Sequence, residues 1–197
     1  MKLRPYQEEA ADFIYENDKS LILAKVGAGK TAIALTAMRD MLTNGIVRRW
    51  LVVAPRLVAA DVWPAETALW APSLKVNVAV GTPAQRRAAF DTPSDVVVIN
   101  YDTLQWFAEQ DVAKQFDGMV LDELTRMKNP GTQKKDGSAP KHGKRFAAFF
   151  EVVKHIEIRV GLTGSFTSNG LEDCYGQVRI IDPTRLGRSK GAFMQQF

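Results

Sequence analysis

The segment from Ala24 to Thr31 combines residue types and a spacing that suit phosphate binding. It reads AKVGAGKT and joins a short apolar run to a helical pattern. Gly27 and Gly29 let a loop curl so that its backbone N–H groups point at phosphate oxygens, and the start of the helix adds partial positive charge. In such a loop Lys30 reaches the β- and γ-phosphates of a nucleotide, and the Thr31 hydroxyl ligates Mg²⁺. The full pattern has glycine where this chain has Ala24.

Two adjacent carboxylates follow another apolar run. Val120 and Leu121 lead directly into Asp122 and Glu123. Side-by-side acids repel one another, so a structural role at a strand end explains them poorly. We expect Asp122 to hold Mg²⁺ through its water shell, and Glu123 to orient and deprotonate an attacking water. A solvated acidic loop is the alternative interpretation.

The elements that position these residues are short apolar runs alternating with helical patterns. The expected strands are 20–24, 50–54, 75–80, 95–99, 119–121 and 156–162, and the expected helices are 31–42, 57–70 (interrupted at Pro64), 83–90, 103–110 and 145–155. Most of the strands are apolar at consecutive positions, which is typical of a parallel sheet covered on both faces. The pattern predicts one doubly wound α/β domain. Because ligands bind beyond the carboxyl ends of such strands, the loops after residues 24, 54, 121 and 162 should share one rim.

The composition is that of one ordinary globular domain. The chain has 197 residues, of which 46% are hydrophobic and 24% are charged. No apolar run approaches ~20 residues, and the amino terminus has no signal-peptide core, so we expect neither a membrane span nor secretion. Cys174 is the only cysteine and the chain has two histidines, which excludes an intrachain disulfide and disfavours structural zinc. These features favour the cytoplasm, and the compact size favours a bacterial or viral source.

Positive charge is concentrated in one segment. The formal net charge is +4, and residues 126–145 hold seven Lys or Arg against one Asp. Glycine and proline punctuate this segment and it has no apolar periodicity, so we expect a surface loop that could meet phosphates. A loop whose lysines only keep it soluble is the alternative.

Further segments share an order and a spacing with these two motifs. They are residues 3–14 (LRPYQEEAADFI), 51–72 (LVVAPRLVAADVWPAETALWAP), 96–104 (VVVINYDTL), 122–129 (DELTRMKN) and 162–183 (LTGSFTSNGLEDCYGQVRIIDP). Together with the phosphate loop, they resemble the first RecA-like lobe of the Swi/Snf-like branch of superfamily-two helicases and translocases. The resemblance covers nearly the whole chain, and it implies a RecA-like P-loop fold.

The resemblance also implies roles for individual residues. ATP and Mg²⁺ would be the cofactors, and Gln7 would read the adenine edge. The residues implied around the nucleotide are Arg4, Gln7, Val26, Gly27, Ala28, Gly29, Lys30, Thr31 and Ala32. Those implied to sense the nucleotide are Thr163, Gly164 and Ser165. Those expected to contact nucleic acid are Arg56, Lys128, Lys134, Lys135, Lys141 and Lys144. Trp63 and Trp70 lie seven residues apart on one helical face, which favours the core over base stacking.

The chain departs from the family pattern in several places. Thr125 stands where a histidine is usual, Phe166 replaces a proline, and residues 131–145 are an insertion. The family has a second RecA-like lobe that supplies an arginine finger, and no segment of this chain matches it. We therefore interpret residues 1–197 as the first lobe of a larger protein, with a natural single-lobe ATPase as the less favoured alternative. These residues should fold alone as a monomer with weak activity.

The predicted function is ATP hydrolysis that drives movement along nucleic acid or its remodelling, with duplex DNA as the favoured partner. Two alternatives stay open at this point. One is a nucleotide-gated DNA-binding module without turnover. The other is a P-loop kinase, which the Asp122–Glu123 pair disfavours because water activation is unnecessary when a substrate hydroxyl attacks.

Overall fold

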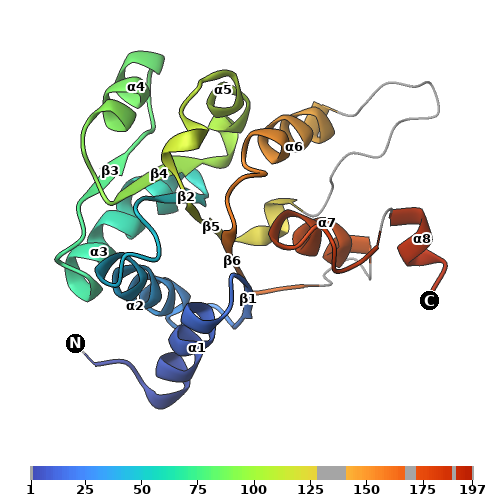
Figure 1. The fold of residues 1–197 in the computed structure, drawn as a ribbon, viewed down its shortest axis with the longest axis horizontal. Helices are drawn as coiled ribbons and strands as arrows, with labels where there is room; N and C mark the ends of the chain where they lie inside the picture. Colours follow the sequence, from blue (N-terminus) through green and yellow to red (C-terminus); the bar gives the residue numbers. More distant parts are fainter. Residues whose placement is uncertain (1, 128–140, 167–171, 188–189, 197) are drawn as a thin grey trace.

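A parallel sheet forms the centre of the computed structural model (Figure 1). The structure describes residues 2–127, 141–166, 172–187 and 190–196. Within them, six strands pair in the order β1-β6-β5-β2-β4-β3, and every pairing is parallel. The strands are β1 (Lys19–Leu23), β2 (Trp50–Ala54), β3 (Val76–Val78), β4 (Val96–Asn100), β5 (Gly118–Asp122) and β6 (Ile158–Thr163).

Helices cover both faces of this sheet (Figure 1). One face carries α1 (Pro5–Glu16), α2 (Lys30–Thr43) and α3 (Trp63–Trp70). The other carries α4 (Pro83–Asp91), α5 (Leu104–Glu109), α6 (Lys141–Val152) and α7 (Glu172–Ile181), with α8 (Lys190–Met194) packed against α7. The predicted doubly wound α/β fold is confirmed.

Strand β2 shows why the apolar runs are continuous. Trp50, Val52 and Ala54 face the core beneath α2 and α3, whereas Leu51 and Val53 face the opposite core. All five are fully buried. Each buried Val or Leu side chain stabilises the fold by about 1.5–3 kcal/mol relative to exposure, so both faces must be apolar. The predicted range 50–54 matches β2, and the other five predicted strands each differ from the structure by one or two residues at both ends.

The described helices depart from the predicted pattern at four places. The sequence pattern does not predict α1, α7 or α8; the segments that form α1 and α7 carry motif residues. The expected interruption at Pro64 is wrong. The chain instead makes a π-helical turn over Val58–Val62 and continues directly into α3. Pro64 is the second residue of α3, next to the π-helical turn. Kinks and π turns of this kind are a common way for a helix to accommodate proline.

The basic segment 126–145 is not wholly a loop, and that prediction needs correcting. Its first two residues belong to a 3₁₀ turn over Leu124–Met127, and residues 141–145 begin α6. Residues 128–140 lie outside the described part of the chain. Among the described residues, no helix has both the length and the apolar character needed to cross a membrane.

A buried arginine holds the edge of the sheet opposite the strand carboxyl ends. Arg159, near the start of β6, is 3% exposed. Its guanidinium donates to the carbonyls of Ile156 (2.7 Å), Ile180 (2.9 Å), Val153 (3.1 Å) and Lys154 (3.1 Å). It therefore joins the ends of α6 and α7 to β6, and burial lowers its pKa.

Candidate active site

The phosphate loop connects β1 to α2 at the carboxyl edge of the sheet. Gly27 and Gly29 have φ values of +81° and +79°, in the left-handed region that favours glycine. Lys30 is the first residue of α2, and its Nζ donates to the carbonyls of Ala24 (2.8 Å) and Lys25 (3.1 Å). Lys30, at the start of α2, therefore connects the end of the phosphate loop back to its beginning.

Helix α1 braces this loop from the other side. The amide of Gln7 donates through Nε2 to the carbonyl of Ala28 (3.0 Å), and its Oε1 accepts from the backbone N–H of Arg4 (2.9 Å). The hydroxyl of Tyr6 donates to the same Ala28 carbonyl (3.0 Å). A Cβ built on Gly29 would stand 2.2 Å from Gln7 Nε2, so loop and helix are in close contact.

The acidic pair ends β5 beside the loop. Asp122 is 9% exposed; its Oδ2 accepts a hydrogen bond from Trp63 Nε1 (3.0 Å), and its carbonyl accepts one from the Tyr101 hydroxyl (2.7 Å). Burial raises the pKa of Asp122, against the hydrogen bonds from Trp63 and the Glu123 backbone and the charge of Lys30. The pKa of Tyr101 is also raised well above its ordinary value, first by burial and then by the two carboxylates. Tyr101 therefore stays a neutral donor.

Glu123 differs from its neighbour in both exposure and backbone. It is exposed, and its φ of +57° lies in the left-handed region, which is uncommon for a residue with a side chain. This turn ends the strand and directs the Glu123 carboxylate to the wall of the cavity described next. Strained residues of this kind gather at functional sites.

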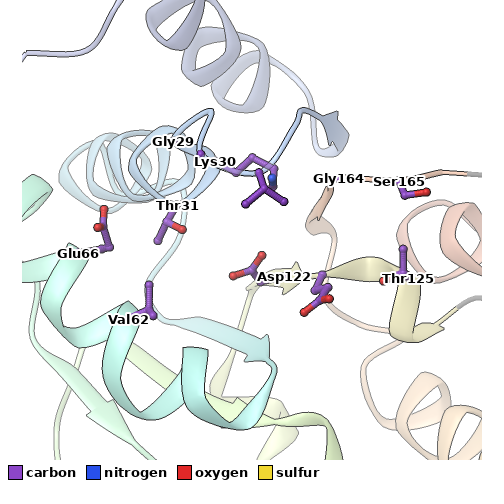
Figure 2. A pocket seen from close by; sticks show the side chains of 12 residues that line it. Gly29, Lys30, Thr31, Val62, Glu66, Asp122, Thr125, Gly164 and Ser165 are labelled. Atoms are coloured by element: carbon purple, nitrogen blue, oxygen red, sulfur yellow. The ribbon is translucent and has the colours of Figure 1, made fainter. Parts of the chain in front are cut away.

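The phosphate loop and the acidic pair border one cavity of about 680 Å³ (Figure 2). Its walls come from the phosphate loop, α3, the end of β5 and the loop after β6. The lining residues are Val26, Gly27, Gly29, Lys30, Thr31, Val62, Glu66, Asp122, Glu123, Thr125, Gly164 and Ser165. The predicted common rim is confirmed for the loops after β1, β5 and β6, whereas the loop directly after β2, the fourth one predicted, contributes no lining residue.

The loop after β6 forms the third wall. Thr163 is fully buried, and its hydroxyl donates to the carbonyl of Ser165 (2.6 Å) and accepts from the Ser165 N–H (3.3 Å). The backbone N–H of Ala24 donates to the Thr163 carbonyl (3.1 Å), which ties this loop to the phosphate loop. Gly164, Ser165 and Thr125 line the cavity, so these segments are placed where they can report its contents.

Other predicted residues lie away from the cavity. Arg4, Gln7, Ala28 and Ala32 are not among its lining residues, and Ala32 is buried in the helix packing. The Gln7 amide is engaged by backbone groups, so its adenine contact stays a prediction. Arg56 follows β2 and is exposed. Lys128, Lys134 and Lys135 lie outside the described residues, and the side chains of Lys141 and Lys144 are likewise not described.

The structure adds residues that sequence reasoning missed. Val62 and Glu66 bring the start of α3 to the cavity wall. Trp63 is buried in the core, as the helical spacing predicted, and Trp70 packs partly buried against the same core. The indole hydrogen bond to Asp122 was not predicted, because helical spacing identifies the buried face and not what the polar edge of the ring meets. One sequence signal was available: Glu66 lies three residues after Trp63, so the two side chains leave neighbouring parts of the helix surface.

The donor set fits a hard cation of the Mg²⁺ type. Thr31 and Asp122 supply hydroxyl and carboxylate oxygens from facing walls of the cavity (Figure 2). Within the described part of the chain, no group of three or more His, Cys, Asp or Glu could hold a metal by itself. Mg²⁺ commonly takes one or two protein oxygens and completes its shell with water and phosphate, so this sparse set is appropriate.

A phosphate loop, an acidic strand end and a third loop on one rim of a parallel sheet define a RecA-like P-loop domain of the superfamily-two helicase type. The chain belongs to the family described as "Type III restriction enzyme, res subunit", whose family model matches residues 1–168.

Relatives and solved structures agree with this assignment. The chain is 33% identical to "Putative protein p41" of Acyrthosiphon pisum secondary endosymbiont phage 1, over 98% of this chain and 42% of that protein. It is 22% identical to the "Uncharacterized ATP-dependent helicase YqhH" of Bacillus subtilis, over 98% of this chain and 31% of that protein. The "Sulfolobus solfataricus SWI2/SNF2 ATPase core in complex with dsDNA" has the same fold, with a TM-score of 0.76 and 23% identity over 100% of this chain and 39% of that one. The chain thus spans less than half the length of these proteins.

Proposed function

We propose that this chain is the ATP-binding lobe of a DNA-dependent ATPase, which hydrolyses ATP to move along duplex DNA or remodel it. The observation that carries the proposal is the meeting of Lys30, Thr31, Asp122 and Glu123 around one cavity, although about ninety residues separate the two motifs. The family assignment and the helicase names of relatives support it.

Nucleotide binding would use the phosphate loop and the start of α2. The Lys30 ammonium now donates to two backbone carbonyls, and it would exchange these neutral acceptors for the charged oxygens of the β- and γ-phosphates. The helix amino terminus adds partial positive charge at the same place. Thr31 and Asp122 would hold Mg²⁺, which supplies charge neutralisation at the phosphates when bound.

Hydrolysis would use Glu123 as the general base. Its carboxylate lines the cavity from an exposed turn, so it can accept a proton from a water that attacks the γ-phosphate. Lys30 would stabilise the negative charge on the transferring phosphoryl group. Gly164 and Ser165 would sense the γ-phosphate because they line the cavity, and Thr163 would act through its hydrogen bonds to the Ser165 backbone.

The proposed partners are duplex DNA and a second RecA-like lobe. The exposed Arg56 follows β2 on the active rim, and the net positive segment 126–145 follows the acidic pair. A solved neighbour of the same fold is a complex with double-stranded DNA. We further propose that residues 1–197 are one lobe of two, and that the second lobe supplies an arginine finger. The isolated chain would be a monomer.

The deciding experiment measures phosphate release with and without duplex DNA, for this chain alone and joined to a downstream RecA-like lobe. The joined form should show DNA-stimulated turnover. The chain alone should stay near background, because an arginine finger is worth on the order of 10³–10⁵ in rate. ATP binding without turnover in both forms would favour the nucleotide-gated module. Strong DNA-stimulated turnover by the chain alone would contradict the need for a second lobe.

A further inference from the structure

The indole of Trp63 makes a polar contact inside an otherwise apolar core. Trp63 is fully buried and Asp122 is 9% exposed, and Nε1 lies 3.0 Å from Asp122 Oδ2. The two residues are 59 positions apart, so the bond joins the start of α3 to the end of β5. A buried carboxylate with one oxygen held by a donor loses rotational freedom, and its plane is set by that donor.

Hydrogen bonds on both sides of Trp63 fix the orientation of its ring. The backbone N–H of Trp63 donates to the carbonyl of Val58, five residues earlier, which closes the π-helical turn Val58–Val62. A π turn inserts a residue into the helical winding and so changes the direction in which the next side chain leaves the helix. The Thr67 hydroxyl donates to the Trp63 carbonyl (2.7 Å) and fixes the following turn. Both sides of Trp63 are therefore anchored by hydrogen bonds.

The same aspartate is also held through its main chain. The Tyr101 hydroxyl, from the residue that follows β4, donates to the Asp122 carbonyl at 2.7 Å. With the backbone held from one side and Oδ2 from the other, the carboxylate keeps a single orientation at the cavity wall, facing Thr31 (Figure 2). Val62 and Glu66 flank Trp63 on the cavity wall, so α3 contributes to the site along its first turn.

We propose that Trp63 is a positioning residue for Asp122, whose carboxylate it orients toward the Mg²⁺ of the bound nucleotide. This inference rests on the proposed function, since it assumes that Asp122 serves the metal. Donors that orient metal-binding side chains from behind typically change metal affinity by about 10- to 100-fold when removed. A ring that served only to fill the core would affect stability and leave the metal dependence unchanged.

The test compares Trp63→Phe with Trp50→Phe. Both tryptophans are fully buried in the same core, but the Trp50 indole nitrogen has no hydrogen-bond partner among the described residues. Trp50→Phe therefore removes the same ring area without disturbing a polar contact. The measurement is the binding of a fluorescent ATP analogue to the 197-residue chain, without Mg²⁺ and across a Mg²⁺ titration.

Trp63→Phe should raise the half-saturating Mg²⁺ concentration by about 10- to 100-fold and leave the Mg²⁺-free nucleotide affinity unchanged. Trp50→Phe should leave both quantities at the wild-type values. If Trp63→Phe does not fold, the benzothienyl analogue of tryptophan at position 63 keeps the shape and replaces the N–H by sulfur. The same rise in the half-saturating Mg²⁺ concentration is expected for that analogue.

Two results would contradict the proposed role of Trp63. The first would leave the proposed function intact, and the second would not. Wild-type Mg²⁺ dependence in both position-63 variants, with Mg²⁺-dependent binding present in the parent chain, would leave the proposed function intact and assign Trp63 to core packing alone. A parent chain whose nucleotide binding ignores Mg²⁺ altogether would contradict the proposed role of Asp122, and the inference would fall with it.

Discussion

Replacing Gly29 by alanine tests whether α1 braces the phosphate loop. The φ of +79° at this position costs an alanine about 1–2 kcal/mol. The new Cβ would stand 2.2 Å from Gln7 Nε2, so the Gln7 amide must move. Gln7 then loses its hydrogen bonds to Ala28 and Arg4, each worth about 0.5–1.5 kcal/mol. We expect Gly29→Ala to lower the free energy of unfolding by about 2–5 kcal/mol.

Gly27 offers a matched control in the same loop. Its φ is +81°, and a Cβ there would have no atom within 4 Å. Gly27→Ala should therefore carry the backbone strain alone, about 1–2 kcal/mol. Urea unfolding of the two variants gives both free energies by linear extrapolation. In a Gln7→Ala background the contact is absent, so Gly29→Ala should there cost no more than Gly27→Ala.

Equal losses of stability in Gly27→Ala and Gly29→Ala, with Gln7 present, would refute a stabilising contact between α1 and the phosphate loop. That result would mean that the glutamine yields freely, and that its two hydrogen bonds contribute nothing to the placement of the loop. Equal losses in the Gln7→Ala background together with unequal losses in the parent chain would instead assign the difference to this contact.

Three further predictions concern single residues. Lys30→Ala should weaken ATP binding by about 10- to 150-fold, because the phosphates lose a charged donor; unchanged affinity by calorimetry would remove Lys30 from the phosphate site. Glu123→Gln, tested with the downstream lobe present, should lower turnover by about 10²–10⁴ with ATP binding retained; an unaltered phosphate-release rate would exclude it as the base. Arg159→Met should lower the free energy of unfolding by about 3 kcal/mol or more, since four carbonyls lose a buried donor. Nucleotide affinity should stay unchanged in the folded Arg159 variant, and a loss there would show that the two edges of the sheet are coupled.

Several features of the fold could be predicted from the sequence because their signals are local. The run Trp50–Ala54 is apolar at every position, which is typical of a strand covered on both faces, and it coincides with β2. The glycines of the phosphate loop mark a turn by their backbone freedom, and both have positive φ. The parallel arrangement then places the loops after β1, β5 and β6 on one rim, as the order of strands and helices predicted.

The structure alone decided how the residues of that rim are held. The resemblance implies an adenine contact for Gln7, which stays a prediction, and the structure adds that its amide bonds to the backbone of Ala28 and Arg4. Trp63 was expected in the core, and it lies there with its indole N–H directed at Asp122. Hydrophobic spacing reports which face of an element is buried, whereas a hydrogen bond between residues 59 positions apart depends on where the fold places the start of α3 relative to the end of β5. That placement depends on the packing of the whole core. The sequence alone therefore identifies the acidic pair Asp122–Glu123, whereas the tertiary structure decides how Asp122 is oriented.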